Sequence, residues 1–495
     1  MLQQVKPGNA VIMGAGIAGL AAAMALARHG WRVRVIERDP QIPEGGADTA
    51  FCKWRRRGVP QMRHSHVFLA RLTNLLRDHY PALLEDMLGA GCRILDFRDS
   101  LPESLLLNYV PEPGDADLSF ISSRRVTLEI VMRRHVGAIA NVEILAGHKI
   151  RGLMTEQGST PPRVKGVEIE ADGQRWKMPA DIVIDASGRG SHAPSWLHSM
   201  GVRIEEESSP AGIVYFTRHY RFRGGNQEPQ RGKYPAAGEL DYLKYGVFRA
   251  DNGWFSLTLA VPEIEEGLRK AACDAEVFEN ICRLLPGVAP WRATGLAEPM
   301  SDVSVMGGVR NIWRHFYTDG HPAALNFFVI GDAATSSNPL YGRGCAAGFL
   351  QAHLMAGICA RSGNPFERAL LFDTAMKREL RPYFDVMVKQ DEAARRRAIA
   401  SREGAHRPDL RARMTKFFFE DGVRPAARGD IKVMRALMRG FHMLEDPRIA
   451  LQDPEILLRV SRFMLRGHAR NAGLLGPAIG PKREEMLKQL SLPVR

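Results

Sequence analysis

The feature that most constrains this chain is a glycine-rich turn between a short apolar strand and an alanine-rich helix. The strand is predicted over 9–13, the turn reads Gly-Ala-Gly-Ile-Ala-Gly over 14–19, and the helix covers 20–29. A second strand follows over 32–36 and ends at Glu37. Strand, turn, helix and strand within about 30 residues form the βαβ unit of a parallel sheet that is covered by helices.

Each glycine of this turn has its own predicted role. Gly14 permits the tight turn, Gly16 lets the backbone approach a pyrophosphate, and Gly19 lets helix and strand pack closely. The N-terminus of the helix presents free N–H groups and a partial positive charge to the phosphates. Glu37 is placed to accept hydrogen bonds from an adenosine ribose. The unit is therefore predicted to bind a dinucleotide, either a nicotinamide or a flavin.

A second glycine-rich segment favours the flavin. Gly331 and Asp332 end a buried strand, which places a carboxylate at the carboxyl edge of the sheet, where it can hold ribityl hydroxyls. Gly342 and Gly344 let the chain run close to a flavin ring. The helix that starts at Cys345 then points its positive end at that ring and stabilises the anionic reduced form.

Together these motifs resemble those of the FAD-dependent monooxygenases of the aromatic-hydroxylase and epoxidase type. The glycine turn with Glu37 resembles the family's adenosine-binding fingerprint, and Arg125-x-x-Leu128-Glu129 resembles its helix-borne arginine near the cofactor. The segment 331–344 resembles its ribityl and flavin-ring motif. The resemblance implies FAD, with these candidate binding residues: Gly14, Ala15, Gly16, Ala18, Gly19, Glu37, Arg38, Arg125, Gly331, Asp332, Pro339, Gly342, Gly344 and Cys345.

Within this superfamily the motifs more closely resemble polyether-type polyketide epoxidases and, more distantly, squalene epoxidases. The likeness rests on the segments 57–66, 185–191 and 338–342. Ser187 stands where hydroxylases that bind NAD(P)H directly usually carry an acid. The resemblance implies insertion of one oxygen atom of dioxygen into a lipophilic substrate through a flavin 4a-hydroperoxide, by alkene epoxidation or hydroxylation. NAD(P)H or a separate reductase is the implied electron source.

Two other functions stay open on the sequence. Geranylgeranyl reductases share an Asn-Pro-Leu-containing cofactor motif, so a flavin-dependent prenyl-chain reductase is one alternative. A non-enzymatic docking flavoprotein, whose basic C-terminal region matters more than its flavin, is the other.

Catalytic and substrate residues are less constrained by the motifs, because epoxidation requires no specific catalytic base. Arg63 and His64 are candidates for positions beside the flavin, and hydrogen bonding to backbone carbonyls or solvent is the alternative. The aromatic residues Tyr215, Phe248 and Phe255 are predicted to line a substrate pocket on alternating strands, with a plain core role as the alternative.

The predicted architecture is α/β, with a Rossmann-like FAD-binding domain, an inserted antiparallel β-sheet substrate domain and an α-helical C-terminal region. The FAD-binding domain is predicted over 1–75, 110–205 and 300–360, the substrate-binding sheet domain over 76–109 and 206–299, and the basic helical region over 361–495. Alternation of apolar residues over 212–223 and 254–261 predicts the antiparallel strands.

The net charge of +13 is concentrated in the C-terminal region, where residues 361–495 hold 28 Lys and Arg against 17 Asp and Glu. This predicts peripheral contact with an anionic membrane, or docking of a flavin reductase or carrier protein, with a solvated helical face as the alternative. No recognisable motif supports nucleic-acid binding.

The six cysteines include no CxxC pair, so neither a metal site nor a disulfide framework is predicted, and a cytoplasmic location is expected. No stretch of 18 apolar residues predicts a membrane span.

Overall fold

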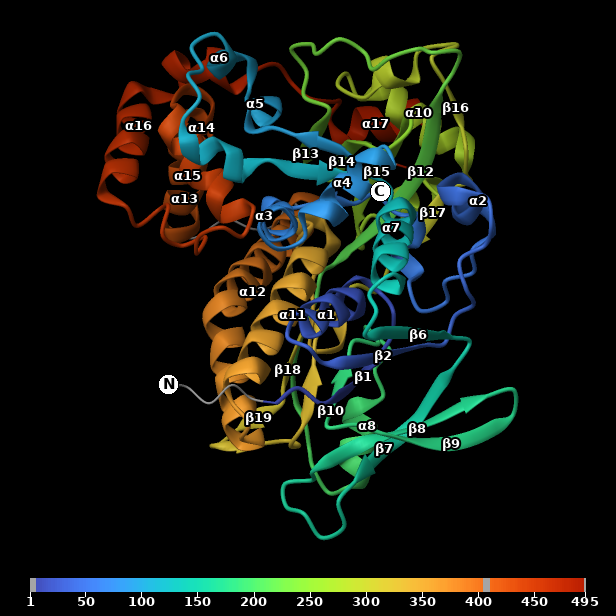
Figure 1. Ribbon diagram of the computed structural model, residues 1–495. Helices are drawn as coiled ribbons and strands as arrows, with labels where there is room; N and C mark the ends of the chain where they lie inside the picture. The colour runs from blue at the N-terminus through green and yellow to red at the C-terminus, as the bar shows by residue number, and fades with distance from the viewer. Residues whose placement is uncertain (1–5, 404–409, 494–495) are drawn as a thin grey trace.

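The structure, a computed structural model, describes residues 6–403 and 410–493. A five-stranded parallel sheet in the order β21–β10–β1–β2–β6 lies in its lower half (Figure 1). The strands are β1 (Asn9–Met13), β2 (Arg32–Glu37), β6 (Val142–Ala146), β10 (Ile182–Asp185) and β21 (Phe327–Val329). Four of the five are nearly continuous runs of apolar residues, as strands covered on both faces require. The predicted α/β class is confirmed.

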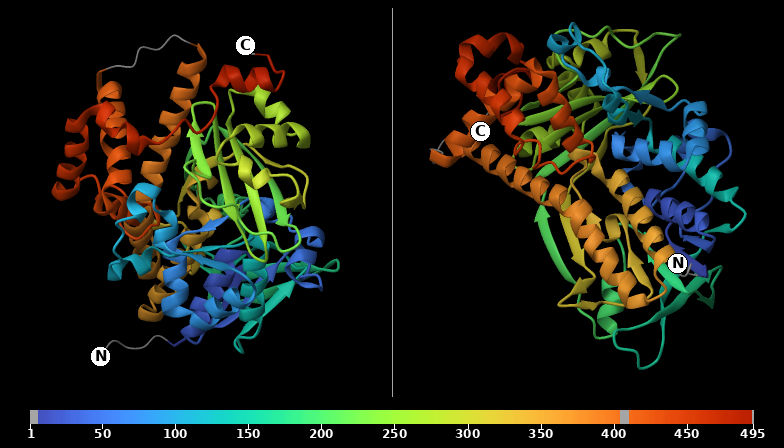
Figure 2. Two further views of the ribbon diagram at one scale, coloured as in Figure 1. Left: turned by 90° about the horizontal axis from the view of Figure 1, so that it is seen from above. Right: turned by 60° about the vertical axis from the view of Figure 1, so that its left-hand side comes forward.

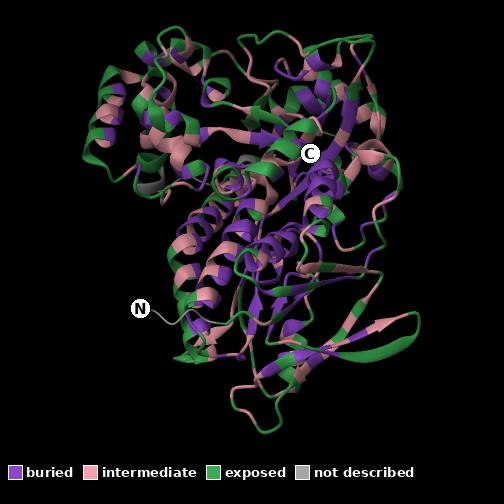
Figure 3. Cartoon of the chain, in the orientation of Figure 1, coloured by how far each residue is buried: buried purple, intermediate pink, exposed green. Residues whose placement is uncertain are grey.

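Helices cover this sheet and join it to the glycine turns. The main ones are α1 (Ile17–Arg28), α7 (Arg125–Gly137) and α11 (Arg343–Arg361), and α1 packs against both of the others. Small residues bring α1 and α11 close together, because Ala18 of α1 contacts the positions of Gly331 and Gly348. Both helices are largely buried, as the purple segments of Figure 3 show.

The middle sheet is a six-stranded antiparallel sheet above the parallel one. It consists of β13 (Ala237–Leu240), β14 (Leu243–Arg249), β15 (Trp254–Pro262), β12 (Ile213–Phe222) and β16 (Ala297–Pro299) in that order, with β17 (Ser304–Met306) beside β12. One face packs against α10 (Ala275–Leu284) through Tyr220, Phe255 and Phe278. Successive side chains of a strand point to opposite faces, so the residues in between form the other face. That face lines a cavity together with residues of the parallel sheet.

The C-terminal region is not a separate appendage. The helix α12 (Pro365–Glu403) runs from the parallel-sheet body toward the middle sheet, as Figure 2 shows, and its first half buries Phe372, Met376 and Leu380 in the main core. A second group comprises α13 (Leu410–Phe417), the π-helix η6 (Phe418–Val423), α14 (Arg424–Gly429), α15 (Ile431–Phe441) and α16 (Pro454–Leu475). This group surrounds a small core of its own.

The last helix returns to the middle sheet. In α17 (Arg483–Gln489), Met486 and Leu487 are buried in the same core as β12 and β15. The segment before this helix also accepts hydrogen bonds from the sheet, since the hydroxyls of Tyr242 and Tyr245 donate to the carbonyls of Pro481 and Ile479. The end of the described chain therefore completes a core that began more than 200 residues earlier.

The predicted assignment of 76–109 to the substrate-sheet domain is wrong. The helices α3 (Ala70–His79) and α4 (Pro81–Gly89) pack into the core of the parallel-sheet body through Leu76, Leu83 and Met87. Residues 97–105 pack instead against the C-terminal region around α15. Helical periodicity in a sequence identifies a helix but does not say which core the helix faces.

The remaining elements connect these parts. They are α2 (Gly46–Lys53), η1 (Pro60–Arg63), β3 (Val67–Phe68), β4 (Arg93–Leu95), α5 (Phe97–Ser100), α6 (Glu103–Leu106), η2 (Pro113–Leu118), β5 (Phe120–Ser122), β7 (Lys149–Thr155), β8 (Val164–Ala171), β9 (Gln174–Pro179), α8 (Ala193–Ser199), β11 (Glu205–Pro210), α9 (Glu266–Ala271), η3 (Ala289–Arg292), β18 (Arg310–His315), β19 (Tyr317–Thr318), β20 (His321–Pro322), η4 (Gly331–Ala333), β22 (Thr335–Ser336) and η5 (Pro339–Tyr341).

Among the described helices, none combines the length and apolar character that crossing a bilayer requires.

Candidate functional site

A large cavity of about 1180 Å³ joins the parallel sheet to the middle sheet. One end lies at the carboxyl ends of β1, β2 and β10, and the walls beyond it come from β12, β14, β15, α12 and α15. Open α/β sheets bind ligands at the carboxyl ends of their strands, so this end is where a dinucleotide is expected.

The glycine turn has the geometry that its sequence predicts. Gly14 has φ +98°, and a Cβ on it would lie 2.8 Å from the carbonyl oxygen of Ala186. A Cβ on Gly19 would lie only 1.9 Å from the carbonyl oxygen of Gly14. A Cβ on Gly16, in contrast, would meet nothing within 4 Å. Gly14 and Gly19 thus hold strand and helix together, while Gly16 faces open space at the N-terminus of α1, where a pyrophosphate fits.

Glu37 lies at this end of the cavity but is already engaged by the protein. Its carboxylate accepts hydrogen bonds from the backbone N–H groups of Ala15 and Asp39, each at 3.0 Å. Arg56 and Arg133 each place a guanidinium nitrogen 2.9 Å from its Oε2 atom. Burial raises the pKa of Glu37, but the two arginines more than offset this and hold it below its usual value.

The sequence reading of Glu37 as a ribose acceptor therefore omitted a second role. Its carboxylate anchors the glycine turn, and Arg56 and Arg133 extend this anchor to Glu129 of α7. Sequence reasoning missed both arginines, and the basic segment around 55–57 was a signal for Arg56 only. A ribose at this position would share the oxygens of a carboxylate that is kept ionised.

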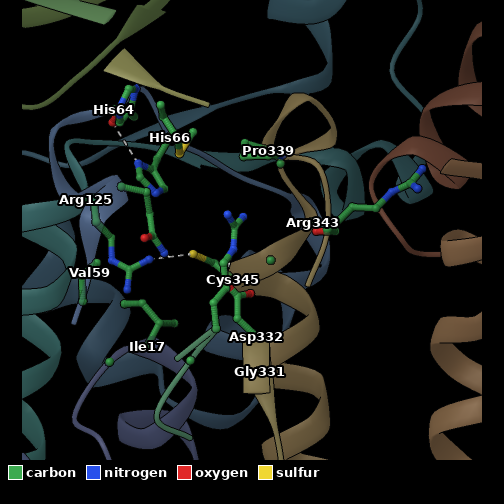
Figure 4. A pocket seen from close by; sticks show the side chains of 18 of the residues that line it. Ile17, Val59, His64, His66, Arg125, Gly331, Asp332, Pro339, Arg343 and Cys345 are labelled. Carbon is green, nitrogen blue, oxygen red and sulfur yellow. Dashed lines mark hydrogen bonds and ion pairs between the residues drawn. The ribbon is translucent and has the colours of Figure 1, made fainter. Parts of the chain in front are cut away.

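Two residues far apart in the chain meet at the N-terminus of α11. The Nη1 of Arg125 donates to the Sγ of Cys345 at 3.2 Å (Figure 4). The Nε of Arg125 lies 3.3 Å from the carboxylate of Glu129. Burial raises the pKa of the Cys345 thiol, against the effect of Arg125. Arg125 therefore points into the cavity as a fixed cation next to a thiol that stays protonated.

Asp332 lies on the same side of the cavity, three residues after the end of β21. Its Oδ2 is 3.6 Å from the Nε of Arg189, and its Oδ1 is 3.8 Å from the position of a Cβ on Gly344. Burial raises the pKa of Asp332, while Arg189 and Arg125 oppose that rise. A carboxylate with few protein donors beside a glycine is suited to accept hydrogen bonds from ribityl hydroxyls.

The loop 338–342 is held from behind by Asp391 of α12. The carboxylate of Asp391 accepts from Nδ2 of Asn338 at 3.0 and 3.1 Å, from Nδ2 of Asn311 at 2.8 Å and from the Tyr341 hydroxyl at 2.9 Å. The Tyr215 hydroxyl donates to Oδ1 of Asn338. Burial raises the pKa of Asp391, and these donors oppose the rise. In every hydrogen bond that the structure shows for its side chain, Asp391 is the acceptor.

A polar stripe crosses the cavity face of the middle sheet. Thr217 and Thr258 are opposite one another on β12 and β15, and their hydroxyls lie 2.8 Å apart. Nδ1 of His64 lies 3.0 Å from the Thr217 hydroxyl, and the Ser65 hydroxyl lies 2.7 Å from that of Thr258. Burial lowers the pKa of His64 to about 4, so the ring is neutral at neutral pH. The stripe offers hydrogen bonds but no charge to a ligand.

Arg63 does not belong to this site, contrary to the prediction. Its guanidinium donates to the carbonyl oxygen of Cys52 at 3.1 Å and lies over the ring of Phe51. It does not line the cavity, whereas His64 and His66 do. The short helix η1 turns residue 63 outward, and the next residues turn back toward β12.

Of the three predicted substrate residues, two line the cavity and one does not. Tyr215 and Phe248 lie on the cavity face, but Phe255 is fully buried on the opposite face, between Tyr220 and Trp291. Phe255 is opposite Arg249 in the ladder, while Phe248 is opposite Ser256, so the two phenylalanines point in opposite directions. The prediction for Phe255 is wrong, because alternation tells which residues share a face but not which face is the cavity.

Leucine at these two positions should therefore have different effects. Phe255→Leu is expected to lower the free energy of unfolding by about 1.5 kcal/mol through lost aromatic packing, without changing ligand affinity. Phe248→Leu should leave the melting temperature nearly unchanged and alter substrate affinity instead. Thermal unfolding and ligand titration of both variants check this, and equal effects on affinity would contradict the assignment of faces.

Twelve of the fourteen predicted cofactor residues line the cavity: Gly14, Gly16, Ala18, Glu37, Arg38, Arg125, Gly331, Asp332, Pro339, Gly342, Gly344 and Cys345. The other two, Ala15 and Gly19, support the turn from behind, through the N–H of Ala15 and the close packing at Gly19. Within the described ranges 6–403 and 410–493, no group of three or more His, Cys, Asp or Glu side chains is arranged to hold a metal ion.

Comparisons with known proteins agree with this geometry. The family model described as FAD dependent oxidoreductase matches residues 9–195. Protein Rv3254 of Mycobacterium tuberculosis is 30% identical over 375 residues, which cover 72% of this chain and 73% of the relative. The FAD-dependent monooxygenase OpS4 of Beauveria bassiana is 23% identical over 306 residues, which cover 57% of this chain and 64% of the relative.

A solved structure shares the fold. The p-nitrophenol 4-monooxygenase PnpA of Pseudomonas putida superposes with a TM-score of 0.57 at 17% sequence identity, over 89% of this chain and 99% of PnpA.

Proposed function

Because this chain belongs to the FAD-dependent oxidoreductases, in the superfamily of FAD-dependent monooxygenases, we propose that it inserts one oxygen atom of dioxygen into a lipophilic substrate. The observation that carries this proposal is the cavity that joins the dinucleotide end of the parallel sheet to a chamber under the middle sheet. A cofactor and a substrate can meet there without leaving the protein. Alkene epoxidation and hydroxylation are the two reactions that the resemblance of the motifs implies.

The residues of the cavity fit FAD. Open space at Gly16 accommodates the pyrophosphate, Asp332 offers acceptors for ribityl hydroxyls, and the N-terminus of α11 faces the place of the ring. When bound and reduced, FAD supplies the electrons that activate dioxygen. NAD(P)H or a separate reductase is proposed as the source of those electrons.

The protein itself has four tasks in such a reaction. Asp391 fixes the loop 338–342 beside the cofactor site, and Arg125 places a permanent positive charge in the cavity. The neutral stripe at Thr217 offers hydrogen bonds that orient a substrate, and the buried walls exclude water. None of these tasks requires a general base, and the pKa of about 4 that burial gives His64 makes its ring a weak base.

A prenyl-chain reductase is the alternative enzyme. A monooxygenase adds an oxygen atom from dioxygen to its product, whereas a reductase adds hydrogen, so an isotope label distinguishes the two enzymes. The FAD-loaded protein is reduced, mixed with ¹⁸O₂ and a panel of lipophilic alkenes and arenes, and the products are analysed by mass spectrometry. Monooxygenation gives one ¹⁸O atom per product molecule and no product without oxygen. Saturated product under anaerobic conditions, or recovery of all oxygen as hydrogen peroxide without labelled product, would overturn the proposal.

Docking of the C-terminal region on a membrane or a protein partner stays a prediction. The helix α13 exposes Leu410, Met414 and Phe417, and the cations Arg413 and Lys416 are exposed beside them. This combination of exposed apolar and cationic side chains supports contact with an anionic lipid surface.

A further inference from the structure

Residues of the C-terminal region form one wall of the cavity. In sequence, this wall is the part of the lining farthest from the glycine turn. The helix α12 contributes Gln390, Ala394 and Arg397 to the lining, and the end of α15 contributes Met438 and Phe441, with His442 in the following turn. These elements face residues of β14 such as Lys244 and Phe248. We call this part of the cavity the distal chamber.

Arg343 brings a buried cation without a counter-ion to this chamber. It lines the cavity with 6% of its surface exposed and forms no ion pair within the described part of the chain. Its Nη1 donates to the carbonyl oxygen of Tyr383 at 2.9 Å, and the guanidinium lies over the rings of Tyr341 and Tyr383. None of the described residues accepts a hydrogen bond from its Nε. Buried arginines are almost always paired, so this position lacks an anion.

The direction of Arg343 separates it from the cofactor residues. Figure 4 shows its side chain extending away from Arg125, Asp332 and Cys345. The nearby carboxylate of Asp391 does not neutralise it by direct contact, because that carboxylate is engaged by Asn311, Asn338 and Tyr341 (see above). Among the described residues, Arg343 therefore forms no ion pair with the cofactor residues, and it contacts the loop 338–342 through the ring of Tyr341.

His442 adds a second donor without an acceptor. The side chain is 1% exposed, and its Nδ1 accepts a hydrogen bond from the backbone N–H of Ala70 at 3.2 Å. Since Nδ1 is the acceptor, the proton of the neutral ring lies on Nε2. Burial lowers the pKa of His442 to about 4, which keeps the ring neutral. In the part of the chain that the structure describes, the Nε2–H group has no hydrogen-bond partner. A buried unpaired donor is costly unless something binds it.

Positive charge also exceeds negative charge among the lining residues of β14 and α12. Lys244 and Arg397 both approach one carboxylate, that of Glu239, at 2.9 and 3.6 Å. The other side chains of the chamber are mainly apolar, among them Phe248, Met438 and Phe441. A ligand that satisfies this chamber is apolar along its body and carries an anionic oxygen at one end.

We propose that the distal chamber binds the carboxylate group of an amphiphilic substrate, with the Arg343 guanidinium and the His442 Nε2–H as its donors. The proposal rests on the proposed function for the reaction that follows, and it narrows the substrate class from a lipophilic molecule to a lipophilic acid. The apolar part of the acid then lies along Phe248 and Met438, toward the cofactor end of the cavity.

The test compares an acid with its ester in the FAD-loaded protein. The probes are 2-naphthoate and methyl 2-naphthoate, and binding is followed by the change in flavin absorbance and by calorimetry. His442→Asn keeps an acceptor near the position of Nδ1 for Ala70 but removes the Nε2 donor, and Arg343→Met removes the charge at similar length. Arg378→Met, an exposed arginine of α12 that pairs with Glu379, is the control for loss of a positive charge.

The wild-type protein is expected to bind the acid at least tenfold more tightly than the ester. Each of His442→Asn and Arg343→Met should weaken binding of the acid by about tenfold to a hundredfold, because a hydrogen bond to a charged group is lost. Binding of the ester, and binding of both probes by Arg378→Met, should be unchanged. Equal losses for acid and ester, or no preference for the acid, would overturn the proposal.

Failure of the two proposals can be told apart. Selective binding of naphthoate without ¹⁸O incorporation from the substrate panel would leave the carboxylate site standing and reject oxygen insertion. Incorporation of ¹⁸O into uncharged substrates with no preference for the acid would support oxygen insertion and reject the carboxylate site.

Discussion

Replacing Gly19 by alanine is expected to abolish retention of FAD and to lower the melting temperature of the cofactor-free protein by several degrees. The new Cβ would lie 1.9 Å from the carbonyl oxygen of Gly14, and the backbone that carries these two atoms is fixed by the sheet and by α1. Neither can move away as a flexible side chain would, so the helix must shift from the strand. A cost of about 3 kcal/mol or more is expected from such overpacking.

A matched substitution separates folding from binding at this turn. Gly16→Ala places its Cβ in open space with an extended backbone, so the melting temperature of the cofactor-free protein should not change. Affinity for FAD should still fall by about tenfold, because the methyl group occupies the space that a pyrophosphate needs. Gly357→Ala, whose Cβ also meets nothing within 4 Å, is the control in α11 and should affect neither quantity. A Gly19→Ala protein with wild-type stability would contradict the packing argument.

Replacing Asp391 by asparagine should have the second large effect, although this residue lies outside the fingerprint motifs. The carboxylate accepts hydrogen bonds from Asn311, Asn338 and Tyr341, and an amide of the same shape offers one acceptor oxygen for these donors. Buried donors are then left unpaired, at a cost of about 3 kcal/mol or more. The loop 338–342 should lose its fixed shape, and FAD affinity should fall by at least about tenfold.

Measurement of FAD affinity, the visible flavin spectrum and thermal unfolding checks this expectation. Glu392→Gln changes the adjacent carboxyl of α12, for which the structure shows no hydrogen bond to the loop, and serves as the control. A spectrum shift with unchanged stability would mean that Asp391 acts mainly on the loop. Wild-type FAD affinity and stability in Asp391→Asn would refute its role as a positioning residue.

The cofactor end of the cavity was predictable because its requirements are local. The positive φ of Gly14 and the close packing at Gly19 are consequences of one tight turn, and the spacing of the glycines records that turn directly. The same holds for Asp332, since a residue that closely follows a buried parallel strand has to lie at the ligand edge of the sheet. Local chain geometry was enough to place these residues without knowing the rest of the fold.

The other end of the cavity depends on contacts between distant segments. Asp391 reaches Asn338 from 53 residues away, and His442 meets Ala70 across 372 residues. Such pairs leave no periodic signal in a single sequence. The alternation along β15 likewise predicted that the strand has two faces. Which face lines the cavity, that of Phe248 or that of Phe255, depends on the position of α10, and the alternation does not give that position. The basic composition of the C-terminal region indicated its charge but not that it encloses the cavity.

The return of α17 to the middle sheet has a consequence for synthesis of the protein on the ribosome. The hydroxyl of Tyr242 donates to the carbonyl of Pro481, which is synthesised 239 residues later. Met486 and Leu487, which complete the core of the middle sheet, are also synthesised late. At cellular elongation rates this interval lasts roughly ten to fifty seconds. During that time the nascent sheet exposes an apolar surface that only its own C-terminal segment can cover, so its safe maturation depends on chaperones or on late assembly of the sheet.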